Sequence, residues 1–394
     1  MLMAWTFPAS VDYAMFAALH GRSYPRQVIK YMSISESSVR AALESFVEPY
    51  LQQTLAQAGA LRAVELSGDA VLARIELGFP ALGYSHALQA ALQSHLHASG
   101  QPVALTLELS NAILAHAVQR NLQPLAGVKN IVAVASGKGG VGKSTVAVNL
   151  ALAWTAAGAQ VGILDADIYG PSQPLMLGLT GEHPSSPDGK HIQPLHAHGL
   201  TAMSIGFLVD PLQAVVWRGP MVTQALTQLL GDTEWGELDY LVVDMPPGTG
   251  DIQLTLAQRV PVAGAIIVTT PQDIALADAR KGLAMFEKVS VPVLGIIENM
   301  SVHVCTHCGH AEHIFGAGGG ARLAAEHGVA LLGELPLDAR IREQADGGRP
   351  SVVAEPDGPA AQAYVEAARK AAAVLARRAR DRSTLFPKIV VEDS

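Results

Sequence analysis

Apolar and polar positions repeat in two different ways along the chain, and each repeat predicts its own kind of domain. Over residues 32–118, helical spacing of apolar residues alternates with short runs that are typical of strands. The predicted helices are Ser35–Leu51 and Tyr84–Leu96, and the predicted strands are Leu61–Leu66, Ala70–Leu77 and Val103–Leu109. This order indicates a small α+β domain, preceded by residues 1–31 as an N-terminal extension that we expect to be poorly ordered.

Residues 130–375 alternate continuous apolar runs with helical segments, which is typical of a parallel sheet covered by helices on both faces. The predicted strands are Ile131–Ala135, Val161–Leu164, Tyr240–Val243, Ala265–Val268, Val293–Ile297 and Ala330–Leu332. Residues 119–129 are the expected linker, and Gly181–Gly199 is an expected loop insertion. A last helix is predicted from Pro359 to about Arg380, and residues 376–394 are the expected tail. The chain is therefore predicted to have an α/β fold behind its small α+β domain.

The stretch from Gly137 to Ser144 fits the pattern G-x-x-x-x-G-K-[ST]. The backbone N–H groups of such a turn surround phosphate oxygens, and the helix that follows adds its dipole. A predicted strand precedes the stretch and a predicted helix, Thr145–Ala157, follows it, so the fold prediction becomes a P-loop NTPase. We expect Lys143 to neutralise the outer phosphates and Ser144 to bind Mg²⁺. The expected nucleotide-binding residues are Gly137, Lys138, Gly139, Gly140, Val141, Gly142, Lys143, Ser144 and Thr145.

Lys138 lies one residue after the first glycine, too early to serve the phosphates of its own chain as Lys143 does. A lysine at this place resembles the signature of the "deviant" P-loop proteins, in which it reaches the nucleotide of a dimer partner. A cation supplied in trans accelerates phosphoryl transfer by roughly 10³–10⁵-fold in the arginine-finger case. We therefore expect a homodimer around ATP, and slow hydrolysis by the chain alone.

Aspartates follow two of the predicted strands, and functional residues gather at the carboxyl ends of parallel strands. Asp165 and Asp167 follow Val161–Leu164, and Asp244 follows Tyr240–Val243. Asp244 is expected to hold Mg²⁺ through water, and Asp167 to contact the water shell of the metal or to position the attacking water. Turn or cap formation is the alternative for each of them. The predicted catalytic residues are Lys138, Lys143, Asp167 and Asp244.

Cys305 and Cys308 are the only cysteines of the chain, and they lie in a polar loop rich in histidine. Two thiolates at this spacing supply half of a four-ligand metal site. Histidines of the same chain would complete a zinc site, whereas the same pair on a second chain would complete the four thiolates of an iron–sulfur cluster. Redox thiols or a structural role are the remaining alternatives. The nearby histidines are His303, His307, His310 and His313.

Charge and composition argue against several classes of protein. The net charge of −8 disfavours a general nucleic-acid-binding surface. No stretch has the length and apolarity of a membrane span, and residues 1–31 lack the pattern of a signal peptide. Two cysteines three positions apart fit a reducing compartment. We therefore expect a cytoplasmic protein with no nucleic-acid or membrane partner.

Many segments, in the same order, resemble the Mrp-type ATPases, which are bacterial relatives of the eukaryotic cytosolic iron–sulfur scaffold ATPases. The resemblance covers about residues 125–372. Its segments are Ser136–Thr145, Val161–Ser172, Val216–Met221, Trp235–Leu256, Thr269–Asp273, Glu298–Ser301, Ile314–Gly320 and Gly333–Arg342. The resemblance implies an ATP-binding homodimeric carrier that binds a labile 4Fe-4S cluster shared between two chains. The implied partners are recipient apo-iron–sulfur proteins and cluster-assembly proteins.

The resemblance also implies roles for single residues. By this resemblance, Cys305 and Cys308 are expected to bind the cluster, and Asn299 is expected to contact the adenine. Lys138, Lys143, Ser144, Asp167 and Asp244 inherit the nucleotide and Mg²⁺ roles, with Ser144, Asp167 and Asp244 on the metal.

The chain departs from the family pattern in two places. Thr306 stands where a proline usually follows the first cysteine, which loosens the loop without removing its ligands. The small domain resembles the iron–sulfur-assembly domain often fused ahead of these ATPases, but its loop Gly78–Gly83 lacks the usual cysteine. Its acidic segment is reduced to Val47-Glu48-Pro49-Tyr50. We expect this domain to bind a partner rather than a cluster of its own.

Two other functions compete with the carrier. A partition or positioning ATPase of the same superfamily would need a basic DNA-binding face or an amphipathic membrane tail. A zinc-stabilised nucleotide switch would need histidines to complete the metal site.

Overall fold

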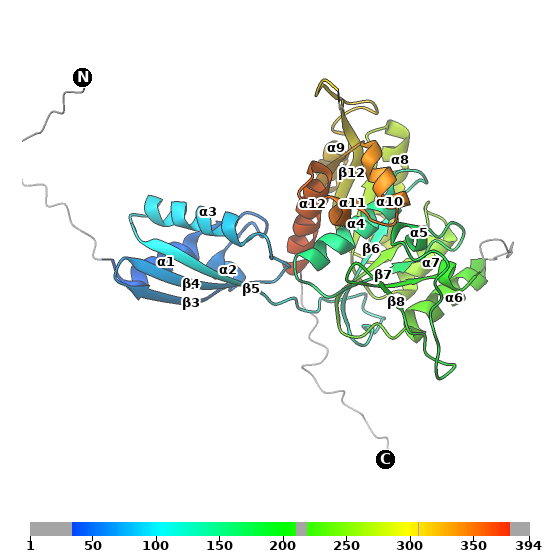
Figure 1. The fold of residues 1–394 in the computed structure, drawn as a ribbon, viewed down its shortest axis with the longest axis horizontal. Helices are drawn as coiled ribbons and strands as arrows, with labels where there is room; N and C mark the ends of the chain where they lie inside the picture. The colour runs from blue at the N-terminus through cyan, green and yellow to red at the C-terminus, as the bar shows by residue number, and fades with distance from the viewer. Residues whose placement is uncertain (1–33, 210–218, 306, 379–394) are drawn as a thin grey trace, which may run out of the picture. The chain divides into compact units, whose positions relative to one another are not determined.

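The computed structural model describes residues 34–209, 219–305 and 307–378 (Figure 1). The predicted N-terminal extension, Thr306, residues 216–218 of the family resemblance and most of the predicted tail lie outside these residues. The described residues from Glu36 onward belong to one compact unit.

The small N-terminal region contains the predicted order of helix, two strands, helix and strand. Strand β3 pairs with β4 antiparallel, β4 pairs with β5 parallel, and α1 and α3 pack together beside this sheet. Leu43 and Leu88, two of the apolar positions that predicted the helices, are fully buried, whereas Val47, which follows Ser45, is 56% exposed. The elements are α1 (Glu36–Ser45), β1 (Val47–Glu48), β2 (Gln53–Thr54), α2 (Leu55–Ala58), β3 (Leu61–Ser67), β4 (Ala70–Leu77), α3 (Ser85–Ala98) and β5 (Ala104–Asn111).

The first helix is shorter than predicted, because the segment after Ser45 forms a small hairpin of β1 and β2. Pro49 disfavours helical backbone at the residue before it, Glu48. The buried Glu48 carboxylate then accepts hydrogen bonds from Leu51 N at 2.6 Å and from Tyr84 Oη at 2.8 Å. The prediction of a helix that continues to Leu51 is therefore wrong after Ser45.

The larger region is built on a sheet of nine described strands in the order β13-β12-β11-β6-β10-β7-β9-β8, with β14 beside β12. The pairs from β12 through β11, β6, β10 and β7 to β9 are parallel, as is the pair of β14 with β12. These strands are β6 (Val128–Ala135), β7 (Val161–Asp165), β8 (Leu195–Ala197), β9 (Leu200–Ser204), β10 (Leu238–Asp244), β11 (Val262–Thr269), β12 (Val293–Val304), β13 (Ala311–Glu312) and β14 (Ala330–Pro336). All six predicted strands are present.

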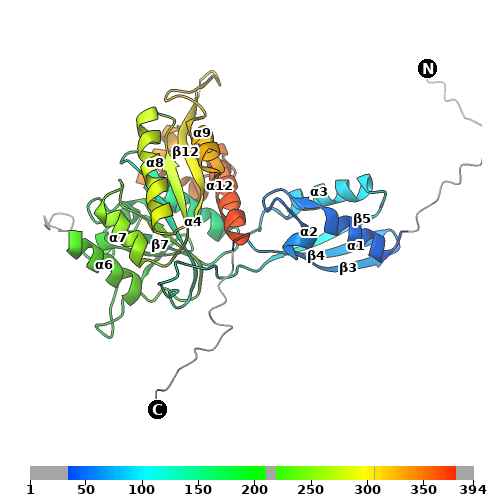
Figure 2. The same ribbon diagram turned by 180° about the vertical axis from the view of Figure 1, so that it is seen from behind.

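Helices cover both faces of this sheet, with α4 and α12 on one face and α7 and α8 on the other (Figures 1 and 2). Trp154 of α4 stacks on Tyr240 of the sheet with ring centres 4.7 Å apart, and its Nε1 donates to Ala368 O of α12 at 2.8 Å. The helices are α4 (Lys143–Ala156), α5 (Gln173–Met176), the short 3₁₀ turn η1 (Ile205–Phe207), α6 (Gly219–Asp232), α7 (Asp251–Arg259), α8 (Asp273–Lys288), α9 (Gly319–His327), α10 (Ala339–Asp346), α11 (Ser351–Ala354) and α12 (Pro359–Ala376).

The segment Gly181–Gly199 is not a loop throughout. Its last part forms β8, which pairs antiparallel with β9 and ends the sheet. His198 and Gly199 both have positive φ, 52° and 81°, as the two-residue turn of a hairpin requires. The prediction of a loop is therefore wrong for the end of this segment.

Candidate functional site

The nucleotide loop, residues 137–144, joins the end of β6 to the start of α4. Gly140 and Gly142 each have a φ of 81°, in the left-handed region that favours glycine. A side chain at Gly137 would collide with the backbone of Asp278 in α8. A cavity of about 250 Å³ lies over the loop, and its wall includes Lys138, Lys143, Ser144, Thr145 and Asp167. The local backbone thus has the shape that the sequence motif predicted.

Lys143, which lines this cavity, forms an ion pair with the buried Asp244. Only 6% of Lys143 and none of Asp244 is exposed. Lys143 Nζ donates to Asp244 Oδ1 and, at 3.1 Å, to Ser144 Oγ. Gln173 Nε2 donates to Asp244 Oδ2 at 2.9 Å. The two strongest sequence candidates therefore meet, and a glutamine absent from the sequence candidates completes the contacts of the carboxylate.

Asp165 shapes the segment that carries Asp167 and Gln173. It lies beside Asp244 in the register of β7 and β10. Its carboxylate accepts from the backbone N–H groups of Asp167, Ser172 and Gln173 at 3.1, 2.9 and 3.0 Å. Burial, together with the neighbouring Asp244 carboxylate, raises the pKa of Asp165 to about 7. Asp165 is thus a turn-forming residue, the alternative that the sequence left open for it.

Asp167 and Lys138 also line the cavity over the nucleotide loop. Asp167 Oδ1 accepts from Gly170 N at 3.3 Å, and partial burial raises the pKa of its carboxyl group. Lys138 is exposed. Both positions agree with the predicted roles, which stay predictions.

Asn299 is buried behind the nucleotide loop. Its Nδ2 donates to Val141 O at 2.9 Å, and a side chain at Gly142 would collide with this amide. In this structure Asn299 therefore holds the backbone of the nucleotide loop through its hydrogen bond to Val141. Its predicted contact with adenine stays a prediction.

The second candidate site is the cysteine hairpin, residues 303–312, which connects the long strand β12 to the short strand β13. Cys305 N donates to His310 O, and Gly309 N donates to Cys305 O, both at 2.9 Å. Cys305 is half-buried and Cys308 is exposed. The backbone N–H groups of Cys308 and His307 lower the pKa of the Cys305 thiol. A lowered pKa favours the thiolate, the form that binds metals.

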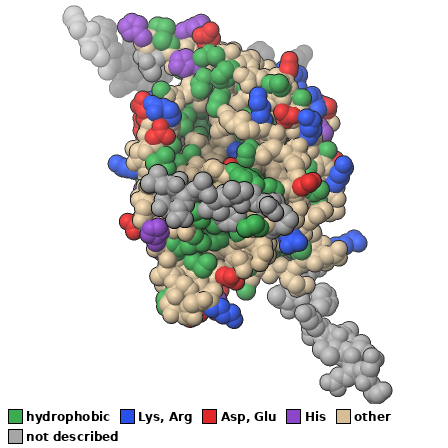
Figure 3. Space-filling model, turned by 90° about the vertical axis from the view of Figure 1, so that its right-hand side faces the viewer, with side chains coloured by type: hydrophobic (Ala, Val, Ile, Leu, Met, Phe, Trp, Pro, Cys, Tyr) green, Lys and Arg blue, Asp and Glu red, His purple; other side chains and the backbone are tan. Residues whose placement is uncertain are grey.

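Two histidines near the cysteines make hydrogen bonds to backbone carbonyl groups. His303 Nδ1 lies 3.0 Å from Leu337 O, and His313 Nδ1 lies 2.7 Å from Ser301 O. Figure 3 shows histidine side chains gathered at one end of the face that it displays. Within the described ranges, no group of three or more His, Cys, Asp or Glu side chains is arranged to hold a metal ion.

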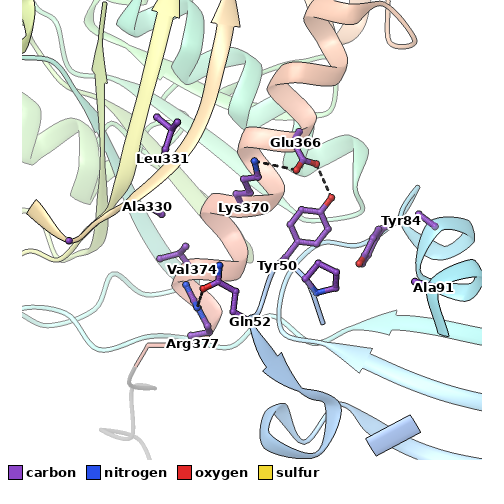
Figure 4. Close-up of a pocket in the computed structure, with 13 residues that line it drawn as sticks. Tyr50, Gln52, Tyr84, Ala91, Ala330, Leu331, Glu366, Lys370, Val374 and Arg377 are labelled. Carbon is purple, nitrogen blue, oxygen red and sulfur yellow. Dashed lines mark hydrogen bonds and ion pairs between the residues drawn. The ribbon is translucent and has the colours of Figure 1, made fainter. Parts of the chain in front are cut away.

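A larger cavity, of about 790 Å³, lies away from both sites, between the small region and α12 (Figure 4). Tyr50 Oη donates to Glu366 at 2.8 Å, and Lys370 lies 3.5 Å from the same carboxylate. The Arg369 guanidinium stacks on the rings of Tyr50 and Tyr84, 5.3 and 5.1 Å from their centres. These groups bind one another, so they hold the small region against α12 rather than present a set of free ligands.

Comparison with known proteins identifies the larger region. The family model of the NUBPL iron-transfer P-loop NTPases matches residues 127–372, which is more than half of the chain. The chain belongs to this family. A second model, of iron–sulfur cluster assembly proteins, matches residues 36–107. Both matches agree with the resemblance noted in the sequence, and the predicted P-loop NTPase fold is confirmed.

Relatives of this NTPase family resemble the chain over most of its length. The iron–sulfur cluster carrier protein of Haemophilus influenzae is 51% identical over 335 residues, which is 85% of this chain and 90% of that protein. The mouse iron–sulfur cluster transfer protein NUBPL is 53% identical over 62% of this chain and 77% of its own length. Among solved structures, a nucleotide-binding protein from Archaeoglobus fulgidus in complex with ADP has a TM-score of 0.53 and 38% identity. It covers 60% of this chain and 91% of its own chain.

Proposed function

We propose that this NTPase is an ATP-binding and ATP-hydrolysing homodimeric carrier that binds a labile 4Fe-4S cluster and transfers it to apoproteins. The observation that carries the proposal is the presence on one chain of a preformed nucleotide loop and a pair of cysteines, of which Cys305 is half-buried and Cys308 is exposed. The ion pair of Lys143 with Asp244 supports the first half. The second half is supported by the exposure of Cys308 and the lowered pKa of Cys305.

The oxygen donors beside the nucleotide loop suit Mg²⁺. Mg²⁺ prefers oxygen ligands and usually keeps several of its waters. Ser144 Oγ and the Asp244 carboxylate both accept hydrogen bonds from Lys143 Nζ. Asp167 lines the cavity over the nucleotide loop. These residues would hold the metal, which neutralises phosphate charge when it is bound. Lys143 would then leave its ion pair with Asp244 and bind the phosphates of the nucleotide. Lys138 would contact the nucleotide that is bound to a partner chain.

The homodimer is supported by apolar side chains exposed beside the nucleotide loop. Tyr169 is 62% exposed and lines, with Asp167 and Pro247, a cavity of about 430 Å³. Apolar side chains also gather around the middle of the face in Figure 3. Exposed apolar surface of this kind is typical of protein–protein contacts. A dimer in which the two cysteine hairpins also meet would supply the four thiolates of a 4Fe-4S cluster.

Recipient apo-iron–sulfur proteins and cluster-assembly proteins are the partners of this carrier, and the cytoplasm is its compartment. Within the part of the chain that the structure describes, no helix has the length and apolarity needed to cross a bilayer. The names of the relatives, which refer to cluster transport and transfer, favour this function over a positioning ATPase. A zinc-stabilised switch would have to recruit histidines whose Nδ1 atoms bind backbone carbonyl groups in this structure.

Metal analysis of the anaerobically reconstituted protein tests the proposal. We expect about four irons and four sulfides per two chains, with visible charge-transfer absorption and a dimeric mass. Cys305→Ser and Cys308→Ser should each abolish the absorption, while nucleotide affinity changes less than about twofold because the cysteine hairpin lies outside the cavity over the nucleotide loop. The matched control Ser301→Ala, near the hairpin, should keep the cluster. About one zinc per chain without sulfide would instead support the switch and overturn the carrier.

A further inference from the structure

Gln173 lies in the segment that Asp165 shapes, at the start of α5, and only 1% of it is exposed. Its Nε2 donates to Ser144 O at 3.1 Å and to Asp244 Oδ2 at 2.9 Å. Because both partners are acceptors, they fix which end of the amide is the nitrogen. The other end, Oε1, is buried and has no hydrogen-bond partner among the described residues.

The two oxygens of Asp244 are held by different kinds of group. Oδ1 accepts from the charged Lys143, whereas Oδ2 accepts from the neutral amide of Gln173. Lys143 is the residue that would turn to the phosphates. Gln173 is anchored independently of Lys143, because its backbone N–H donates to the buried Asp165 carboxylate at 3.0 Å and its Nε2 also donates to Ser144 O. Once Lys143 has moved, Gln173 is the group that still orients Asp244.

We infer that Gln173 is a positioning residue for the Mg²⁺ of the proposed nucleotide site. Its amide N–H groups hold the Asp244 carboxylate and the Ser144 backbone in place, and its Oε1, which has no partner among the described residues, would accept a hydrogen bond from a water of the metal shell. The inference rests on the proposed function, because it needs Mg²⁺ to bind there. Residues that orient metal ligands in this way typically change metal affinity by roughly 10–100-fold when they are replaced.

The test measures nucleotide affinity rather than turnover. A fluorescent ADP is titrated into the full chain with Mg²⁺ and with EDTA, and the ratio of the two affinities is the readout. We call the factor by which Mg²⁺ increases the affinity for ADP the gain from Mg²⁺. Gln173→Met, which keeps the length of the side chain, should reduce this gain by roughly 10–100-fold and leave the affinity for ADP in EDTA nearly unchanged. Gln173→Glu should also lose the gain, since it places a second carboxylate against Asp244. It serves as the test if the methionine variant does not fold.

Gln119 offers a matched control in the same region. Its Nε2 likewise donates to two acceptors, here the carbonyl groups of Ala257 at 2.8 Å and Val260 at 3.2 Å, away from the nucleotide loop. Gln119→Met should therefore keep the full gain from Mg²⁺. If the wild-type chain gains nothing from Mg²⁺, the proposed metal site and this inference both fall. If the wild-type chain gains and both Gln173 variants gain equally, only the inference is overturned.

Discussion

The nucleotide loop is lined by buried side chains that bind one another, whereas the cysteine hairpin carries its thiols near the surface. Lys143, Gln173 and Asp244 are at most 6% exposed; the first two begin helices α4 and α5, and the third ends strand β10. Cys308 is exposed, and the hairpin is held by a short strand pairing and a few backbone hydrogen bonds.

The difference corresponds to what each region has to do in the proposed carrier. A site that reads phosphate charge gains from donors and dipoles fixed in advance, because no reorganisation is then needed. A site that accepts and gives away a cluster must let another protein reach the sulfur atoms. The two regions can therefore be tested separately, and each prediction below changes one of them and leaves the other as its control.

The largest effect is expected for Lys138, which is exposed at the rim of the cavity over the nucleotide loop. Lys138→Gln should lower ATP turnover by roughly 10³-fold or more, as the loss of a cation supplied in trans does. Nucleotide affinity and iron content should change less than about twofold. Steady-state ATPase assays of the dimer, with parallel nucleotide titrations, check this. Unchanged turnover would contradict a role across the dimer.

The next effect concerns stability. Asp244→Ala leaves the buried Lys143 charge without its partner, and breaking a buried pair in this way costs about 3–5 kcal/mol. Adding Lys143→Met to that variant should recover part of the loss. Cys308→Ser changes an exposed side chain and should stay within about 0.5 kcal/mol of the wild type. Urea unfolding of the four proteins checks the contrast, and equal losses for Asp244→Ala and Cys308→Ser would refute it.

The smallest effect is a pH shift at Cys305. The neighbouring N–H groups lower the pKa of this thiol, so its thiolate persists to lower pH than that of an ordinary cysteine. In Cys308→Ser those N–H groups remain and Cys305 is the only thiol. The rate of alkylation by iodoacetamide should therefore reach half of its plateau below about pH 8.5, the ordinary thiol value. A midpoint at or above that value would contradict the lowered pKa.

The sequence predicts the fold well where local pattern and tertiary packing agree. Strands such as β6, β10 and β11 are continuous apolar runs because helices cover both of their faces. The prediction fails where a few polar contacts decide the backbone. The hairpin after Ser45 depends on Glu48 binding Tyr84, thirty-six positions away in the chain. Strand β8 lies in a stretch whose composition is typical of a loop, and only its pairing with β9 makes it a strand.

The candidate site shows the same limit. The motif around Lys143 and the strand-end position of Asp244 were visible in the sequence, and the structure brings the two together. Gln173 had no signal of its own except that it follows the Asp-Ala-Asp-Ile-Tyr-Gly-Pro-Ser segment. Its place beside Asp244 arises from the turn that Asp165 organises, and such a turn cannot be derived from spacing.

The packing of α12 against α4 has a consequence for the synthesis of the chain. Trp154 and its hydrogen-bond partner Ala368 are 214 residues apart. At about 5–20 residues per second, a ribosome needs roughly 10–40 s to add the residues between them. Throughout that interval the face of α4 that packs on α12 has no cover. Helix α12 is thus the step that covers this face, and a chain that stops before Pro359 would present it to chaperones and proteases.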